Sequence, residues 1–416
     1  MGRGIAIVPT APERTRNRDS HYPYRYDSYF YYLTGFTEPE AVLVVTAGDT
    51  SQSILFCRPK DAEREIWDGF RYGPEGARAE FGFDACHVIG DLDSVMPGLL
   101  AGQPQIACHL GSDAQWDARV LGWLNAVRAG VRNGIEAPAA ITDVRSLLDD
   151  MRLIKDEHEL QTMRRAARIS AAAHERAMRA TAPGRAEYEV EAELIHEFRR
   201  GGAQSPAYTS IVAGGANACV LHYVQNDAVL NAGDLLLIDA GCEVDGYASD
   251  ITRTFPVDGR FSPAQREIYE LVLAAQAAAI AEVAPGASWN APHDAAVRVL
   301  AAGLIEFGLC TGSVEKVIET GDYKKFYMHR TGHWLGLDVH DAGEYKHAGD
   351  WRKLEPGMVL TVEPGCYIRP GDGVPGRYAN IGVRIEDDVV VTATGSEVLS
   401  EAAPKSVAAI EAVMRG

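Results

Sequence analysis

An internal repeat is the feature that most constrains how this 416-residue chain can fold. Residues 233–242 (GDLLLIDAGC) align without a gap with residues 357–366 (GMVLTVEPGC). Each copy has a turn glycine, an apolar strand, one acid (Asp239 or Glu363) and then Gly-Cys. The repeat predicts two related halves that face each other, each placing an acid at the centre. The alternative is chance similarity between two amphipathic strands.

The pattern of apolar and helical segments changes near residues 145–155. The first part alternates short apolar runs with a helical pattern, which indicates an α/β domain. Its expected strands are 41–46, 53–57 and 105–110, and its expected helix is 113–128. The second part has longer helical patterns with strands between and after them. These helices are expected at 156–181, 187–200, 263–283 and 291–307, two of them after a Pro-Gly pair. We therefore expect an α+β chain with domains at 1–150 and 151–416.

Charge and composition exclude several function classes. The chain carries 40 basic and 58 acidic residues, a net charge of −18, and no basic patch. Nucleic acid and anionic membranes are therefore not expected partners. No run of 18 apolar residues exists, and the apolar run 5–8 is shorter than a signal-peptide core. The seven cysteines are widely spaced without a CxxC motif, which argues against a disulfide framework, so we expect a cytoplasmic protein.

Two aspartates flank a predicted hairpin. Asp245-Gly246 is a strong signal for a two-residue turn, and such a turn pairs positions whose numbers differ by an odd amount. Asp239 and Asp250 therefore lie on one face of the ribbon, together with Thr252. Like charges at this spacing repel, so a proton, a basic side chain or a metal ion must neutralise them.

Two further acids interrupt apolar strands. Glu363 belongs to the second copy of the repeat, and Glu386 follows the apolar residues 381–385. Arg384 shares a face with Glu386 because side chains alternate along a strand. A single acid in a strand is usually solvent-facing, but four on strands rich in Val, Ile and Leu favour a common site.

Histidines supply the remaining donors. His329, His333 and His340 lie within twelve residues of one another, in a segment whose glycines and Asp338 argue against a continuous helix. The helical patterns also carry isolated histidines, interpreted as surface or packing residues: His158, His174 and His196. Four carboxylates and one histidine suit a pair of divalent ions. Oxygen donors favour Mn²⁺ or Mg²⁺, while a histidine admits Zn²⁺ or Co²⁺, and paired metals indicate hydrolysis.

These residues resemble the pita-bread metallopeptidases, which include methionine aminopeptidase, aminopeptidase P and prolidase. Segment 329–341 and the flanks LIDAG and TVEPG are similar to the proline-peptidase branch. Segments 18–25 (RDSHYPYR) and 32–41 (YLTGFTEPEA) are similar to bacterial Xaa-Pro aminopeptidase. The resemblance covers nearly the whole chain. It implies a C-terminal pita-bread domain after a smaller α/β domain, and release of the N-terminal residue from Xaa-Pro-Yaa peptides by a metal-bridging hydroxide.

The resemblance also implies a role for each site residue. Asp239 would bind one of two divalent ions, most simply Mn²⁺, while Asp250 and Glu386 would bridge both ions. His333 and Glu363 would complete the two coordination shells, and Glu363 would carry the proton to the leaving nitrogen. The other implied residues are His222 and His340 as catalytic groups, His329, Tyr367 and Trp67 as substrate contacts, and Arg384 as the residue that orients the carboxylates. Trp67 would reach a neighbouring subunit's site, which implies a homodimer or homotetramer, whereas its simpler role would be core packing.

Four alternatives share the fold. Prolidase, which cleaves only Xaa-Pro dipeptides, would use the same metals, but the N-terminal segments favour the aminopeptidase. Methionine aminopeptidase does not fit the large N-terminal domain or segment 329–341. A non-catalytic scaffold or a metal-free creatinase-like enzyme would be expected to lack metal ligands, whereas all five are present.

Overall fold

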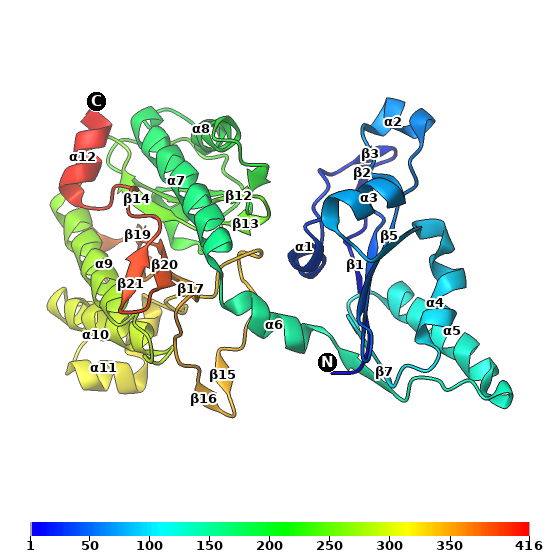
Figure 1. Ribbon diagram of the computed structural model, residues 1–416. Coiled ribbons are helices and arrows are strands. Elements are labelled where there is room, and N and C mark those ends of the chain that lie inside the picture. Colours follow the sequence, from blue (N-terminus) through cyan, green and yellow to red (C-terminus); the bar gives the residue numbers. More distant parts are fainter. Residues whose placement is uncertain (1, 416) are drawn as a thin grey trace. The chain divides into compact units, whose positions relative to one another are not determined.

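The structure, a computed structural model, describes residues 2–415. The chain divides into two compact units that meet in sequence at Met151 and Arg152 (Figure 1). Each unit has its own hydrophobic core. Within the described residues, we find no helix that is long and apolar enough to cross a membrane.

The N-terminal unit is built on a six-stranded mixed sheet in the order β6-β5-β4-β1-β7-β8. Its elements are β1 (Gly4–Pro9), β2 (Thr15–Asn17), β3 (Ser20–His21), α1 (Ser28–Thr34), β4 (Val42–Ala47), β5 (Gln52–Cys57), α2 (Ala62–Asp68), α3 (Gly73–Phe81), β6 (Ala85–Val88), α4 (Leu92–Leu100), β7 (Gln105–Cys108), α5 (Ala114–Ala129), β8 (Ala140–Asp143) and α6 (Arg145–Leu153). Helices α4 and α5 cover one face of the sheet, and α1 and α3 cover the other. This is the expected α/β architecture.

The C-terminal unit combines paired helices with short antiparallel sheets. Its elements are α7 (Glu157–Ala180), α8 (Glu187–Arg200), β9 (Ser205–Pro206), β10 (Ile211–Gly214), β11 (Leu235–Asp239), β12 (Cys242–Val244), β13 (Tyr247–Ala248), β14 (Thr252–Pro256), α9 (Pro263–Ala281), α10 (Ala291–Glu306), α11 (Val314–Thr320), β15 (Lys346–His347), β16 (Asp350–Trp351), β17 (Val359–Val362), β18 (Gly365–Ile368), β19 (Ile381–Arg384), β20 (Asp387–Val391), β21 (Ser396–Val398) and α12 (Val407–Arg415). The four predicted helices of this unit are present, with ends within two residues of expectation.

The repeat corresponds to two halves with one strand plan. In the first half, β11 pairs with β14 and β12 pairs with β13. In the second half, β17 pairs with β20 and β18 pairs with β19. Helices α7 and α9 cross the strands of the first and second half respectively (Figure 1). The internal duplication expected from the sequence is therefore visible in the strand pairing.

Local sequence explains how the first half turns. Asp245 and Gly246 have φ angles of 48° and 80°, the left-handed pair that a type I′ hairpin turn requires. Val244 pairs with Tyr247 across this turn, and the same register places Asp239 opposite Thr252. The predicted turn and the predicted face of the ribbon are both confirmed. Asp156 begins α7 with a reciprocal capping box to Glu159, which explains the sharp helix start.

Candidate metal centre

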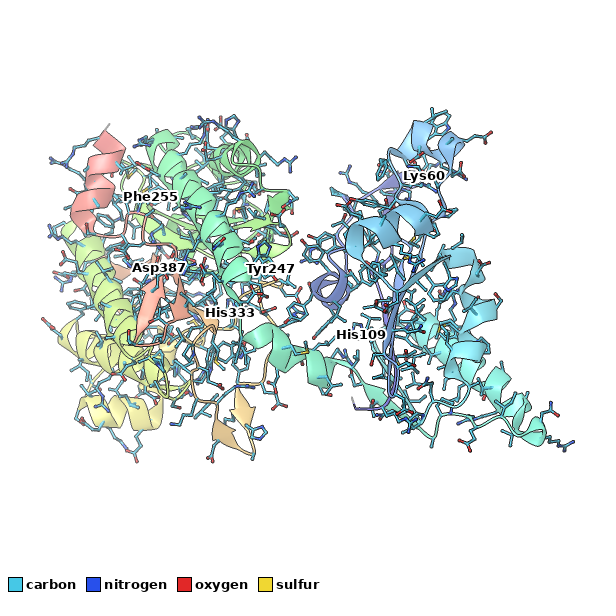
Figure 2. The ribbon with its side chains drawn as sticks, in the orientation of Figure 1. Lys60, His109, Tyr247, Phe255, His333 and Asp387 are labelled. Carbon is cyan, nitrogen blue, oxygen red and sulfur yellow. The ribbon has the colours of Figure 1, made fainter. Side chains whose placement is uncertain are left out.

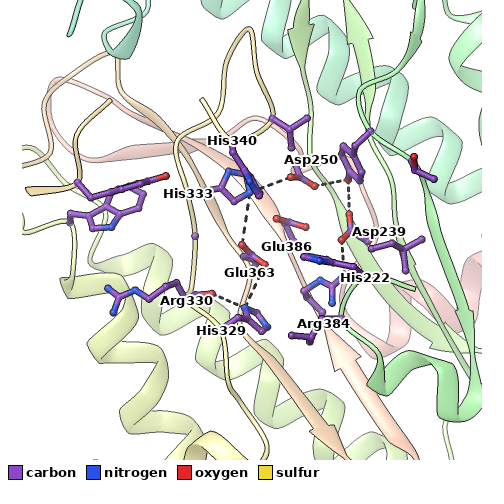
Figure 3. A pocket seen from close by; sticks show the side chains of 18 of the residues that line it. His222, Asp239, Asp250, His329, Arg330, His333, His340, Glu363, Arg384 and Glu386 are labelled. Carbon is purple, nitrogen blue, oxygen red and sulfur yellow. Dashed lines mark hydrogen bonds and ion pairs between the residues drawn. The ribbon is translucent and has the colours of Figure 1, made fainter. Parts of the chain in front are cut away.

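Each half delivers two acids at the points where its strand ladder is interrupted. Asp239 ends β11 and Asp250 lies between β13 and β14. Glu363 lies between β17 and β18, and Glu386 lies between β19 and β20. Figure 3 shows the four carboxyl groups directed toward a common space. The equivalence of the two halves thus places all four predicted acids in one cluster.

His333 reaches this cluster because its segment runs antiparallel beside β17. The amides of Thr361 and Glu363 donate to the carbonyls of His333 and Thr331 at 2.9 and 2.8 Å. The His333 ring donates from Nδ1 to the carbonyl of Trp334 at 2.9 Å. This bond leaves Nε2 directed at Asp250 (3.4 Å) and Glu363 (3.9 Å), the geometry of a metal-ligating histidine.

Donor atoms of Asp250, His333 and Glu386 all lie within 4.8 Å of one another, close enough to share an ion. The cluster holds four buried or half-buried carboxyl groups, and Arg384 is the cation that touches it. Burial raises the pKa of Glu363 to about 7, and burial with repulsion from Asp250 raises the pKa of Glu386. Such an excess of negative charge around one imidazole fits two divalent cations.

Arg384 organises one side of the cluster. Its guanidinium donates to Asp239 Oδ2 at 2.6 Å and to the hydroxyl of Tyr367 at 3.0 Å. The Tyr367 hydroxyl in turn lies 2.8 Å from Nε2 of His329. The Nδ1 atom of His329 is hydrogen-bonded to the backbone carbonyl of Arg330. Because Arg384 can only donate, the Tyr367 hydroxyl is oriented to donate to His329. Both ring nitrogens of His329 are therefore occupied by the protein.

Tyr208 is a site residue that sequence reasoning missed. Its hydroxyl lies 2.6 Å from Asp239 Oδ1 and 2.5 Å from Asp250 Oδ1, so it links the two acids of the first half. Burial followed by repulsion from both aspartates raises the pKa of Tyr208, which keeps the hydroxyl protonated. Tyr208 follows the two-residue strand β9 in a loop, where no periodic pattern could have identified it.

The acids lie in a cavity of about 980 Å³. Its wall includes the other predicted histidines, His222, His329 and His340. The rings of His340 and His333 meet edge to face with centroids 4.3 Å apart. Burial and then the neighbouring His333 lower the pKa of His340. Two predicted residues do not line this cavity. Tyr367 is buried behind its wall against His329 and Arg384. Trp67 lies on α2 of the N-terminal unit and is 84% exposed, so it does not pack in that unit's core.

Glu187 fixes the loop that carries His222, and sequence reasoning missed it too. Its fully buried carboxylate accepts four hydrogen bonds from both sides of that loop. The donors are the amides of Gly214 (2.7 Å) and Ala228 (3.0 Å), the Asn217 side chain (3.1 Å) and the Tyr223 hydroxyl (2.8 Å). An acid in the first turn of α8 is expected for helix capping alone, so its burial was not predictable.

A buried ion pair joins the halves behind the acids. Arg253 of β14 donates to Asp387 of β20 at 2.7 Å and to the backbone carbonyl of Glu386 at 2.6 Å. Both side chains of the pair are fully buried (Figure 2 labels Asp387). Beside them, the carboxylate of Asp388 accepts the backbone amide of Asp250. The predicted packing residue His174 is also fully buried, with Nε2 on the Ala240 carbonyl.

Two models of known protein families match this chain. The model of the family described as "Metallopeptidase family M24" matches residues 161–393, which is more than half of the chain. The chain belongs to metallopeptidase family M24. The model described as "Aminopeptidase P, N-terminal domain" matches residues 1–107. The expected enzyme class, a metallopeptidase, is thereby confirmed.

Relatives in the M24 family extend over the full chain. The chain is 46% identical to Xaa-Pro aminopeptidase of Escherichia coli, with 98% of this chain and 93% of the relative covered. Identity to the Haemophilus influenzae enzyme of the same name is 46%, with coverages of 97% and 91%. The solved structure of Pseudomonas aeruginosa aminopeptidase PepP has 54% identity and a TM-score of 0.98, covering 100% of this chain and 94% of that chain.

A zinc-substituted Escherichia coli aminopeptidase P in complex with product has a TM-score of 0.97 at 45% identity, with coverages of 100% and 95%. These matches confirm the expected fold class, a smaller α/β domain followed by a pita-bread domain. They also confirm the resemblance to bacterial Xaa-Pro aminopeptidases that segments 18–25 and 32–41 indicated.

Proposed function

We propose that this chain is a metal-dependent aminopeptidase that releases the N-terminal residue from peptides with proline at the second position. The observation that carries the proposal is the convergence of four acids and His333 in one cavity of an M24 protein. Near full-length similarity to proteins named Xaa-Pro aminopeptidase supports the choice of substrate over prolidase.

Five residues would hold the ions, namely Asp239, Asp250, His333, Glu363 and Glu386. When bound, two divalent ions supply a water-derived nucleophile at neutral pH and polarise the scissile carbonyl. Each carboxylate oxygen has two lone pairs, so the hydrogen bonds from Tyr208 and Arg384 leave coordination sites on Asp239. Arg384 and Tyr208 orient the carboxylates.

The residues around the acids would bind and protonate the substrate. The acid cluster attracts the free amino group, which restricts cleavage to the first residue. His329, with both nitrogens occupied, offers ring carbons to a proline ring that has no N–H to satisfy. His340 and His222 would stabilise charge developing on the carbonyl oxygen. Glu363 would carry a proton to the departing proline nitrogen.

Three further properties belong to the same proposal. The oxygen-rich donor set favours Mn²⁺, while His333 admits Zn²⁺ or Co²⁺. The exposed Trp67 would extend from one copy of the chain into the active site of another, which makes the enzyme a homodimer or homotetramer. The seven widely spaced, unpaired cysteines support a cytoplasmic location.

The test is hydrolysis of an Xaa-Pro-Yaa tripeptide beside the matching Xaa-Pro dipeptide, after chelation and after addition of Mn²⁺. Release of Xaa from the tripeptide, lost with chelator and restored by metal, is the expected result. Cleavage of the dipeptide alone would make the enzyme a prolidase. Cleavage of neither, in protein that contains no metal after gentle purification, would support the scaffold alternative.

A further inference from the structure

A short hairpin forms part of the cavity wall beyond the acids. Strands β15 and β16 are joined by Ala348-Gly349, whose φ angles of 51° and 93° indicate a two-residue turn. Lys346 lies directly opposite Trp351 in this hairpin, and directly opposed residues share a face. The Lys346 ammonium lies 4.3 Å from the centre of the Trp351 indole, which is a cation–π contact.

A second cation contacts the same indole. The guanidinium carbon of Arg330 lies 5.0 Å from the ring centre of Trp351. Arg330, Lys346 and Trp351 all line the cavity that contains the acids. The neighbouring strand residues His347 and Asp350 point to the opposite face of the hairpin, because side chains alternate along a strand. Lys346 on one face of this hairpin and Arg330 from the preceding segment therefore present two positive charges to the cavity.

These two charges are not neutralised by the protein. Among the described residues that line the cavity, Arg384 is the third cation, and it is committed to Asp239 and Tyr367. Arg330 bonds to the Asn290 side chain, and no carboxylate within residues 2–415 pairs with Arg330 or Lys346. Figure 3 shows the Arg330 side chain pointing away from the acids. The cavity thus carries negative charge in one region and positive charge in another.

The hairpin base is rigid. The ring of Tyr345 stacks on that of Trp334 with planes 4° apart, and its centroid lies 4.8 Å from that of Trp289. The amides of Arg352 and Trp289 continue the ladder by donating to the carbonyls of Tyr345 and Arg352. Because the base is held in place, the cations are positioned before a ligand arrives, which lowers the entropy cost of binding.

We propose that Arg330, Lys346 and Trp351 form a binding site for a carboxylate of the leaving peptide. This inference rests on the proposed function and extends it to a preference among substrates. A short peptide is a zwitterion, so its ammonium end suits the acids and its carboxylate suits the paired cations. In a chain of net charge −18, these cations offset the repulsion that an anionic group would otherwise meet on entering the cavity.

The experiment compares a free-acid tripeptide, Ala-Pro-Ala, with its C-terminal amide on the Mn²⁺-loaded enzyme. The measured quantity is the ratio of kcat/KM for acid over amide, in which differences in folding or metal content cancel. We expect the acid to be preferred about threefold to tenfold, mainly through KM, with the preference falling as salt rises. Arg330→Met with Lys346→Met should bring the ratio to about one, and Lys346→Glu should favour the amide.

Lys353→Met is the matched control, since Lys353 is an exposed lysine near the hairpin that does not line the cavity. It should leave the ratio unchanged. A second pair, Ala-Pro-Glu-amide and Ala-Pro-Gln-amide, separates a side-chain carboxylate from the C-terminal one. Preference for the glutamate peptide would assign the site to acidic side chains as well.

An equal rate on acid and amide by the unaltered enzyme would overturn the inference, as would a ratio that survives the double substitution. Neither result would affect the proposed function. If neither peptide is cleaved under any metal condition, the proposed function fails and the inference fails with it.

Discussion

In the first half of the C-terminal unit the two acids are aspartates, and in the second half they are glutamates at equivalent interruptions of the strands. The aspartates share hydrogen bonds from one hydroxyl, that of Tyr208. Glu386 instead accepts at 2.6 Å from Thr252, a residue of the first half. Tyr208 of the first half links both shorter acids, although Arg384 of the second half also donates to Asp239, whereas Glu386 accepts from a residue of the opposite half.

Close approach of backbone segments, in contrast, is a feature that the two halves share. A Cβ added at Gly241 would lie 1.7 Å from the Ser249 carbonyl oxygen, and one at Gly332 would lie 2.0 Å from that of Thr361. Neither glycine has a left-handed φ, so contact alone explains the requirement. In each half, close contact between backbones therefore excludes a side chain at a position near an acid-bearing strand.

The largest effect should come from removing Asp250 or Glu386. Each lies between the third and fourth strands of its half. Asp250→Ala and Glu386→Ala should each lower kcat/KM about a thousandfold or more, because each removes a carboxylate of the proposed metal site. Tripeptide hydrolysis measures the loss, and circular dichroism of the metal-free proteins checks that the fold survives. Retained activity in either variant would refute a site with two metals, and unequal losses would show that the halves are not functionally equivalent.

The ion pair between the halves should have the next largest effect. Arg253→Met removes one of the two cations that contact the buried Asp387 and leaves Lys405 at 2.7 Å, so it should lower the free energy of unfolding by about 3 kcal/mol, the lower end of the range for a broken buried pair. Arg266→Met removes an exposed pair with Glu270 and should cost less than about 1 kcal/mol. Urea unfolding of both variants measures the difference. Equal, small losses would mean that the halves dock without help from this pair.

Removing a hydrogen bond to the acids should have a smaller effect, and its size should differ between the two halves. Tyr208→Phe removes a contact to two ligands and should weaken metal binding about tenfold to hundredfold. Thr252→Val removes a contact to one ligand and should weaken it less. Titration of the metal-free proteins with Mn²⁺ measures both affinities. A larger loss for Thr252→Val would reverse the view that the first-half acids depend most on local support.

The smallest effect should be a pH dependence of stability. It arises from Asp341, which pairs with Arg152 and Lys155 at the start of the C-terminal unit. The side chain of Asp341 is 1% exposed, and although burial raises its pKa, Lys155 and Arg152 outweigh burial and lower it. A lowered pKa in the folded state stabilises the protein above the ordinary value near 4, and this contribution is lost as the pH falls below it. The stability difference between the unaltered protein and Asp341→Asn should therefore stay constant from pH 7 to about pH 5 and shrink as the pH falls from there to pH 3 and below, as urea midpoints can measure. A constant difference would contradict the assignment.

Much of the fold followed from local signals. The apolar repeat located β11 and β17 with their acids, and Asp245-Gly246 located the turn that aligns Asp239 with Asp250. The resemblance to a family then supplied His222 and Tyr367, both of which line the cavity or bond to residues that do. Periodicity and turn chemistry are local properties, so they can be predicted from the sequence alone.

The supporting residues were not predictable in the same way. Tyr208 acts on acids 31 and 42 residues away, and Glu187 binds donors 27 to 41 residues away. Arg253 and Asp387 meet across 134 residues. A tyrosine in a loop or an acid in the first turn of a helix has an ordinary surface role far more often than a buried one. Their partners become evident only when the strands are paired.

The separation of the acids along the chain also sets an order of assembly. Asp250 and Glu386 are 136 positions apart, so at roughly 5–20 residues per second a ribosome would need roughly 7 to 30 seconds between them. At the start of that interval the nascent chain holds two of the four acids, and His333, Glu363 and Glu386 are added before it ends. In the proposed metal site, complete metal binding is therefore a late event that follows docking of the second half on the first.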